Sequence, residues 1–242
     1  MVTIRFYEEL NDFLKKNKKK VSYSVKTNPG QTVKDLIESE NVPHTEVDLI
    51  LVNSNSVDFS YQVMDMDRIS VYPVFESLDI KNATKLRPLP LRTTLFILDV
   101  NLGKLARYLR MGGFDTLYSN LYKDKEIAEI SARENRILLT RDRDLLKRSI
   151  IQRGHWIRSQ NAVHQYQDVL ERFDLTDSVS LYSRCPQCNG NLLQADKKDI
   201  LDRLAPKTAM YYDNFKTCDS CGKIYWKGSH YYNFIRMTGI HT

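Results

Sequence analysis

The 242-residue sequence has few cysteines and no long apolar run, and these shortages exclude several classes of protein. Its four cysteines lie in two tight pairs, which are too few for a disulfide-rich secreted scaffold. No stretch approaches the roughly 20 consecutive apolar residues that span a bilayer, so we expect no membrane-spanning helix and no membrane partner. The opening residues lack a basic stretch followed by an apolar one, which predicts no secretory signal and a cytoplasmic location.

The sequence also lacks the glycine-rich signatures of nucleotide-binding enzymes. It contains neither the pattern G-x-x-x-x-G-K-[ST] nor the pattern G-x-G-x-x-G. The glycine pair that follows Met111 does not form the nucleophile elbow of a serine hydrolase. Nucleotide hydrolysis, dinucleotide binding and serine hydrolysis therefore have no support.

Charge is present, but it is divided unevenly along the chain. Residues 1–80 hold 9 basic and 13 acidic residues, a net charge of −4, whereas residues 81–242 hold 27 basic and 17 acidic residues, a net charge of +10. Such asymmetry favours a polyanionic partner for the second part, and RNA is the partner that we expect. The alternative is that the basic residues only keep the protein soluble.

The first 78 residues predict a β-grasp domain. Alternating apolar residues indicate four strands, and Thr32 is placed to cap a helix that begins at Val33. The expected strands cover residues 2–7, 21–27, 47–53 and 67–74, with the helix between the second and the third. This order of strand, strand, helix, strand, strand is that of a β-grasp fold.

Two further regions follow a linker at 79–93, in which Pro88 and Pro90 interrupt any periodicity. Strands expected at 95–100, 115–119, 136–140 and 155–159 alternate with helices expected at 103–113, 125–135, 144–151 and 162–173. This alternation predicts a parallel sheet covered by helices on both faces. The expected domains are 1–78, 94–180 and a cysteine-containing module at 181–242.

The cysteine spacing is the strongest local signal in the sequence. Cys185 and Cys188 form one C-x-x-C pair, and Cys218 and Cys221 form a second one after 29 intervening residues. Two such pairs are typical of a tetrahedral zinc site, and four protein ligands leave no open position, so we expect a structural zinc ribbon. A redox dithiol or two disulfides are the alternatives, which a cytosolic setting disfavours. We expect Gly190 and Gly222 to take positive φ in the tight turns after the cysteines.

Four acidic residues follow expected strands of the parallel sheet. Asp99 ends the apolar run LFIL, Asp124 follows the second strand, and Asp142 and Asp144 follow the third. In an open parallel sheet, ligands bind outside the carboxyl ends of the strands. Carboxylates gathered there repel one another, and Mg²⁺ or Mn²⁺ relieves that repulsion and activates water for phosphodiester hydrolysis.

Each of these acids also has a structural interpretation. Asp124 and Asp144 are suited to capping helices, and Asp142 lies between Arg141 and Arg143, where a surface ion pair is the alternative to a functional role. Asp99 is harder to explain structurally, because a carboxylate at the end of an apolar strand is costly to bury unless it is paired.

Basic and aromatic side chains indicate where an RNA backbone would lie. With Leu102, Leu105 and Leu109 on the inner face of a helix, we expect three basic residues on its outer sides. Two arginines flank Asp142, and near the C-terminus aromatics that suit base stacking alternate with basic residues. The candidate RNA contacts are Lys104, Arg107, Arg110, Arg141, Arg143, Trp226, Lys227 and His230. Solvated helix faces, local ion pairs and packing of the ribbon are the alternatives.

Two resemblances add to this interpretation. The segment NSNSVDFSYQVMDMDRISVYPV resembles the ubiquitin-like sulfur carriers, whose members end in a Gly-Gly tail. No glycine lies between Gly30 and Gly103, and we expect the strand to run on into Phe75, Glu76 and Ser77. The resemblance without the tail implies a docking or self-association module that binds a protein partner or a second copy of the chain.

Residues 95–232 contain the stretches FILDVNLGKLARYLRMGGFDTLY and ENRILLTRDRDLL, the two cysteine pairs and YWKGSHY. With a ubiquitin-like domain placed before them, as in several bacterial members, these stretches resemble the Mut7-C RNase domain family. The resemblance implies a PIN-like nuclease fold with an appended zinc ribbon and metal-dependent ribonuclease activity. Asp99, Asp124 and Asp142 match the acidic positions of the family. An RNA- or ribosome-binding protein without catalysis, and a β-grasp docking adaptor, are the alternative functions.

Overall fold

The structure is a computed structural model that describes residues 1–73, 86 and 94–240. The expected continuation of a strand into Phe75, Glu76 and Ser77, and almost all of the expected linker at 79–93, lie outside the described residues. The chain divides into two compact units, a first unit of residues 1–93 and 123–157 and a second unit of residues 94–122 and 158–242. Among the helices described, none combines the length and the apolar character needed to cross a membrane.

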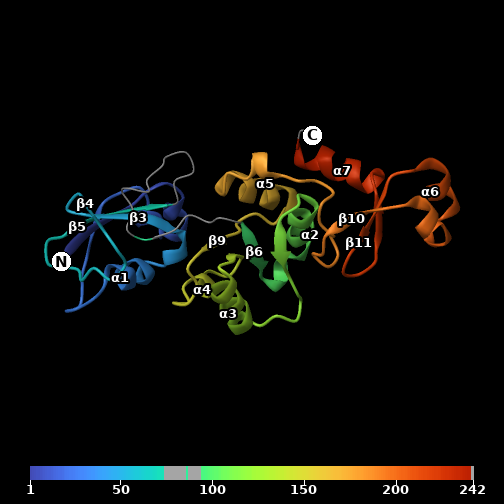
Figure 1. Cartoon of the computed structure of the whole chain (residues 1–242). Coiled ribbons are helices and arrows are strands. Elements are labelled where there is room, and N and C mark those ends of the chain that lie inside the picture. Colours follow the sequence, from blue (N-terminus) through green and yellow to red (C-terminus); the bar gives the residue numbers. More distant parts are fainter. Residues whose placement is uncertain (74–85, 87–93, 241–242) are drawn as a thin grey trace. The chain divides into compact units, whose positions relative to one another are not determined.

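The first 73 residues form a five-stranded sheet of β-grasp topology in the order β2-β1-β5-β3-β4 (Figure 1). Strand β1 is parallel to β5 at the centre, and each of these strands pairs antiparallel with a neighbour, β2 and β3 respectively. The strands are β1 (Val2–Phe6), β2 (Tyr23–Val25), β3 (Val47–Val52), β4 (Asn55–Val57) and β5 (Arg68–Pro73). The short edge strand β4 was not predicted from the sequence.

Local sequence explains the helix of this domain. Helix α1 (Val33–Ser39) begins after Thr32, whose hydroxyl accepts a hydrogen bond from the Asp35 N–H at 3.1 Å, and the Asp35 carboxylate bonds back to the Thr32 N–H. Its apolar residues Val33, Leu36 and Ile37 are fully buried in the core of the β-grasp domain. The predicted cap and inner face of this helix are confirmed.

The first unit also contains two strands and two helices of the parallel α/β region. These are α3 (Asp124–Glu134), β8 (Ile137–Thr140), α4 (Arg143–Leu146) and β9 (Gly154–Trp156). Strand β8 is buried along its whole length and pairs in parallel with β9. The helix expected at 144–151 is wrong in extent, because α4 ends at Leu146 and the chain continues in turns to the buried Ile151.

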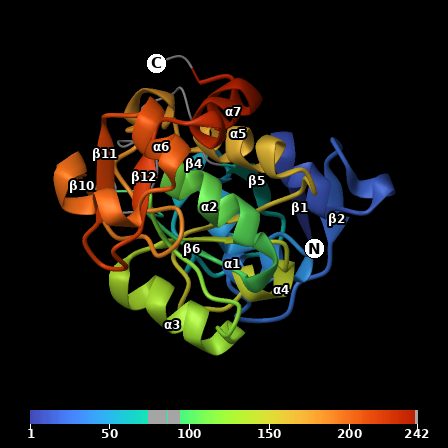
Figure 2. The same ribbon diagram turned by 90° about the vertical axis from the view of Figure 1, so that its right-hand side faces the viewer.

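The second unit contains the other parallel pair and the helices that pack beside it. These elements are β6 (Leu95–Leu98), α2 (Gly103–Met111), β7 (Asp115–Leu117) and α5 (Ala162–Arg172), with β6 parallel to β7. Helix α5 contacts both α2 and the C-terminal helix α7 (Ser229–Thr238), as Figures 1 and 2 show. The contact is aromatic: the rings of Tyr108, Tyr166 and Phe234 meet edge to face with centroids 5.4 to 6.4 Å apart.

The remainder of the second unit is a small antiparallel sheet with the order β10-β11-β12. Its elements are β10 (Leu192–Ala195), β11 (Phe215–Cys218), β12 (Ile224–Trp226) and the short helix α6 (Pro206–Tyr211). Together with the β-grasp sheet and the parallel strand pairs, this four-cysteine ribbon confirms the predicted fold class.

Candidate functional site

The four cysteine side chains converge at one end of the ribbon sheet. The Sγ atoms of Cys185 and Cys221 lie 3.7 Å apart, those of Cys188 and Cys218 lie 3.4 Å apart, and all four fall within 4.8 Å of one another. Zn–S bonds of 2.3 Å in a tetrahedron place sulfur atoms about 3.8 Å apart. The cysteine cluster therefore fits a structural zinc ion with no open coordination position.

The electrostatics of the cluster favour a bound cation. Burial would raise the pKa of the Cys185 thiol, but the Tyr225 hydroxyl at 3.0 Å and nearby backbone N–H groups lower it to about 7. Burial and the neighbouring cysteines raise the pKa of Cys188 to about 12. Four thiols this close cannot all ionise without a positive charge among them, and a Zn²⁺ ion would supply that charge.

The turns after the cysteines differ in part from the prediction. Gly222 has a φ of +68°, as expected, but in the first turn it is Asn189, with φ +73°, that adopts the left-handed conformation. Gly190 is required for a different reason, because a Cβ there would lie 2.8 Å from the Cys218 Sγ. The prediction of positive φ at Gly190 is therefore wrong, and close approach of the second knuckle is what excludes a side chain.

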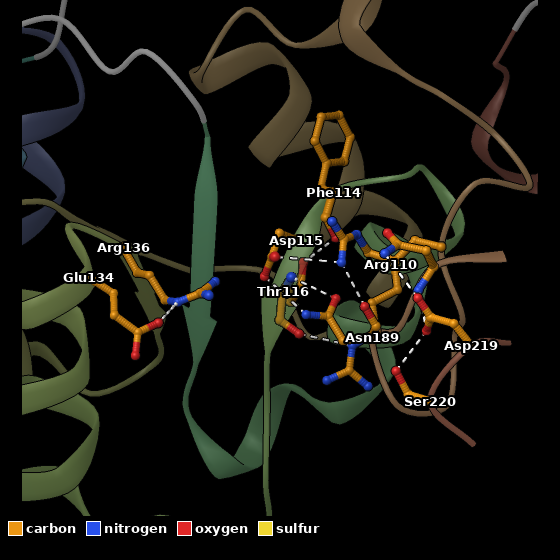
Figure 3. Close-up of polar contacts among 11 residues, drawn as sticks. Arg110, Phe114, Asp115, Thr116, Glu134, Arg136, Asn189, Asp219 and Ser220 are labelled. Carbon is orange, nitrogen blue, oxygen red and sulfur yellow. Dashed lines mark hydrogen bonds and ion pairs between the residues drawn. The ribbon is translucent and has the colours of Figure 1, made fainter. Parts of the chain in front are cut away.

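The first cysteine knuckle is bound to strand β7 and helix α2 (Figure 3). The Asn189 side chain accepts the Thr116 N–H at 2.9 Å and donates to the Asp115 carboxylate at 3.0 Å. Arg110 donates to the carbonyls of Thr116 at 2.9 Å and Gln187 at 3.0 Å. The ribbon is thus attached to α2 and β7 by a network of hydrogen bonds.

This network corrects the predicted role of Arg110. Its side chain is only 6% exposed and points toward the carbonyls of the knuckle, not to the outer side of α2. The apolar spacing of the helix could not reveal this, because the knuckle acceptors of Arg110, the carbonyls of Pro186 and Gln187, lie 76 and 77 residues away in the sequence. Arg110 is therefore a structural residue and not a candidate RNA contact.

Asp99 lies directly after β6 in the second unit. The strand residues Phe96, Ile97 and Leu98 are fully buried, and Asp99 itself is 5% exposed. It precedes a short 3-10 turn at Val100–Leu102 without capping it through its side chain. A carboxylate this deeply buried requires donors or a cation to offset its desolvation.

The three other acids lie in the first unit, where they are exposed. Asp142 is the N-cap of α4, and its Oδ1 accepts the Asp144 N–H at 2.8 Å. Asp144 is paired with Lys147 at 3.1 Å, and Asp124 lies 3.8 Å from Arg148. The capping interpretations of Asp124 and Asp144 are wrong, because Lys123 and Asp142 hold those N-cap positions.

In the part of the chain that the structure describes, the four cysteines are the one set of three or more His, Cys, Asp or Glu side chains close enough to share an ion. The exposed acids Asp124, Asp142 and Asp144 do not form a second set. Any divalent cation at the acidic positions would therefore need water or phosphate oxygens among its ligands, which is how Mg²⁺ is commonly held.

The other candidate RNA contacts have exposed side chains, with the exception of Trp226. Trp226 is half-buried, and its ring packs against Tyr212 and Phe215 with centroids 6.1 and 6.3 Å apart. The exposed candidates are Lys104, Arg107, Arg141, Arg143, Lys227 and His230. Trp156, which contacts the loop around Asp142, was missed because its partners lie far away in sequence.

The cysteine geometry predicts that the purified protein carries about one zinc ion per chain. Elemental analysis of a folded, reduced sample measures this content directly. A zinc-free sample in which the ribbon is nevertheless folded would contradict the assignment of a structural zinc ion.

Comparison with known proteins gives two family matches. Residues 94–238 match the Mut7-C RNAse domain, and residues 1–79 match the domain described as Mut7-C ubiquitin. No curated protein and no solved structure matches the chain. The resemblance to the Mut7-C RNase domain family, with a ubiquitin-like domain before it, is therefore confirmed.

Proposed function

Because the chain belongs to the Mut7-C RNAse domain family, we propose that it is a ribonuclease that hydrolyses RNA phosphodiester bonds with the help of Mg²⁺ or Mn²⁺. The observation that carries this proposal, beside the family, is the burial of Asp99 at the carboxyl end of β6. Ligands of parallel α/β proteins bind at that end of the strands. A buried carboxylate in such a position is a feature of functional sites more than of stable cores.

In this proposal Asp99 and Asp142 each serve as a carboxylate ligand for a divalent cation. Both follow a strand of the parallel region at its carboxyl end, and one Asp142 oxygen, Oδ1, already accepts a backbone N–H that fixes its orientation. Mg²⁺ typically takes one or two protein carboxylates and completes its shell with water and phosphate oxygens. The ion would neutralise charge on the phosphodiester and lower the pKa of a bound water.

Asp124 and Asp144 have weaker support as catalytic residues. Their side chains are 55% and 89% exposed, and each has a basic neighbour. We assign them to the electrostatic surroundings of the ion rather than to its ligands. Because their side chains are exposed, both carboxylates are accessible to solvent and to a substrate. Exposed ion pairs such as these contribute little to the stability of the fold.

Basic side chains are proposed to hold the RNA backbone. Arg141 and Arg143 flank Asp142, and Lys104 and Arg107 are exposed on α2. Exposed lysines and arginines are the main source of phosphate contacts, which position a nucleic acid without reading its sequence. Lys227, His230 and the partly exposed ring of Trp226 would extend this contact onto the ribbon. The net charge of +10 over residues 81–242 is consistent with this assignment.

The domain limits and location remain proposals. We assign 1–78 to the β-grasp domain, 79–93 to a linker, 94–180 to the PIN-like nuclease domain and 181–242 to the ribbon module. The cytoplasm is the proposed location, because it supplies both RNA and reduced cysteines. A protein partner or a second copy of the chain is proposed for the β-grasp domain.

Incubation of the purified protein with total cellular RNA tests the activity. We expect cleavage with Mg²⁺ or Mn²⁺ and none with EDTA, since the ion is needed for water activation and charge neutralisation. Brief EDTA treatment followed by added Mg²⁺ is the control, because it shows that the structural zinc was not removed. Cleavage that persists unchanged in EDTA would contradict the metal dependence.

A second candidate function is RNA binding without cleavage. The role of Asp142 as the N-cap of α4 and the ion pair of Asp144 favour it, because both acids then have structural duties. RNA retention without cleavage under every metal condition would support this alternative.

A further inference from the structure

Within the first unit, the β-grasp domain is joined to strand β9 through a buried carboxylate. Glu46 is fully buried, and its Oε1 accepts the backbone N–H of Trp156 at 2.5 Å. A further partner of this carboxylate is the buried imidazole of His155, whose Nδ1 lies 3.3 Å from Oε1. A buried charge is costly unless it is hydrogen-bonded, so these partners fix Glu46 and β9 relative to each other.

Further contacts of the β-grasp domain reach the same segment. The ring of Phe13 packs on the ring of Trp156, with centroids 5.0 Å apart. The Nε2 atom of His44, which is itself buried, lies 2.8 Å from the carbonyl oxygen of Ile151, while its Nδ1 lies 2.6 Å from Glu38. Residues 151–156 are therefore held by the β-grasp domain through both polar and aromatic contacts.

Trp156 also contacts the loop that carries Asp142. Its indole Nε1 donates to the carbonyl oxygen of Arg141 at 3.3 Å. The guanidinium of Arg143 lies over the same indole, 5.0 Å from the ring centroid. Arg141 and Arg143 are the residues on either side of Asp142, so Trp156 contacts the acidic loop immediately before and after this carboxylate.

We propose that Trp156 is a positioning residue for the loop at 141–144 and that the β-grasp domain, through Glu46 and Phe13, holds Trp156 in place. The proposal rests on the proposed function, because it assigns to Asp142 the task of holding a cation. It differs from the expectation drawn from the sequence, in which the β-grasp domain is a separable docking module. Here the domain contributes to the nuclease reaction without contacting substrate.

The physical argument is preorganisation. Asp142 lies at the exposed start of α4, and an exposed carboxylate that binds a metal loses affinity when its backbone samples several positions. Fixing the Arg141 carbonyl and the Arg143 side chain restricts that backbone, and small displacements of a catalytic group lower rates steeply. Phe13 and Glu46 restrain Trp156 itself, which would otherwise move together with the loop.

Two conservative variants of the full-length protein test the proposal. Trp156→Phe keeps an aromatic ring but removes the indole N–H, and Phe13→Leu keeps an apolar side chain but removes the ring contact. Tyr61→Phe is the matched control, since it removes one hydrogen bond, that from the Tyr61 hydroxyl to Asp67 at 3.1 Å, elsewhere in the β-grasp domain. Thermal unfolding identifies any variant that does not fold.

We expect both test variants to lower kcat roughly three- to tenfold with KM for RNA unchanged, which is about the rate equivalent of one hydrogen bond for Trp156→Phe and of one aromatic contact for Phe13→Leu. We also expect the Mn²⁺ concentration for half-maximal activity to rise by a similar factor, with partial recovery at saturating Mn²⁺. A purely structural role of Trp156 would not move this metal dependence. Hydrogen exchange of the amides at 141–144 should be faster in both test variants and unchanged in Tyr61→Phe.

The proposal would be overturned if both variants matched the wild type in cleavage rate, in metal dependence and in amide exchange. A wild-type protein that cleaves no RNA would instead contradict the proposed function. In that case the exchange of the loop amides, together with Mn²⁺ binding measured by titration, decides whether Trp156 positions the loop. Unchanged exchange and unchanged Mn²⁺ binding would then overturn the positioning role as well.

Discussion

Asp99→Asn is expected to lower the rate of RNA cleavage by several orders of magnitude while RNA affinity stays the same or rises. The substitution keeps the size of the side chain but removes its charge, so the cation loses a ligand and the activation of water is lost with it. Binding is expected to hold because removing a negative charge near phosphates reduces repulsion. Cleavage assays and binding titrations at one fixed salt concentration measure the two effects.

Substitutions of two other acidic residues determine whether the loss of cleavage is specific to the proposed metal ligands. Asp142→Asn should resemble Asp99→Asn, although asparagine can still cap α4 and therefore preserves the helix. Asp124→Asn should be milder, because this exposed side chain forms a surface ion pair with Arg148, and such pairs contribute little. Cleavage at the wild-type rate in folded Asp99→Asn and Asp142→Asn would end the nuclease assignment for this site and favour the RNA-binding alternative.

The second large effect is expected at the zinc ribbon. Cys218→Ser should reduce the zinc content from about one ion per chain to nearly none and unfold the ribbon. The apparent binding free energy of structural zinc in small modules is on the order of 10–16 kcal/mol, more than such a short sheet gains from its own packing. Elemental analysis and protease digestion, followed by mass spectrometry of the fragments, measure the two outcomes.

The effect should extend into helix α2. Arg110 would lose its Gln187 acceptor with the knuckle, and a buried guanidinium without its acceptor costs roughly 1–3 kcal/mol. We therefore expect faster hydrogen exchange in α2 as well as in the ribbon. Ser220→Ala is the matched control, because Ser220 lies between the second pair of cysteines and is not a ligand. Cys218→Ser with normal zinc content and protease resistance would contradict the structural role of the metal.

The interpretation of the β-grasp domain changes most between sequence and structure. The missing glycine tail led to the expectation of a docking module. The proposed positioning role rests instead on contacts with Ile151 and Trp156, which depend on His44 and Glu46, two residues that look like ordinary turn residues in the sequence. No local pattern distinguishes a buried carboxylate in a 3-10 turn from an exposed one.

The sequence by itself determined the features that depend on local spacing. Alternation of apolar residues placed four of the five strands of the β-grasp sheet, and short apolar runs between helices placed the strands of the parallel region. Thr32 marked the start of α1, and two C-x-x-C pairs placed four sulfurs around one point. These features follow from the periods of strands and helices and from the reach of a short turn, so each is encoded within a few residues.

Only the tertiary structure decided the features that depend on distant partners. It turned Arg110 inward toward Gln187, ended α4 at Leu146 and placed Trp156 between Phe13 and Arg143. Arg110 and Trp156 have partners that lie outside the local segment, and the end of α4 is set by which side chains are buried. A side chain takes the direction in which its hydrogen-bonding groups are satisfied once water is excluded, and what excludes the water is the packing of the whole chain.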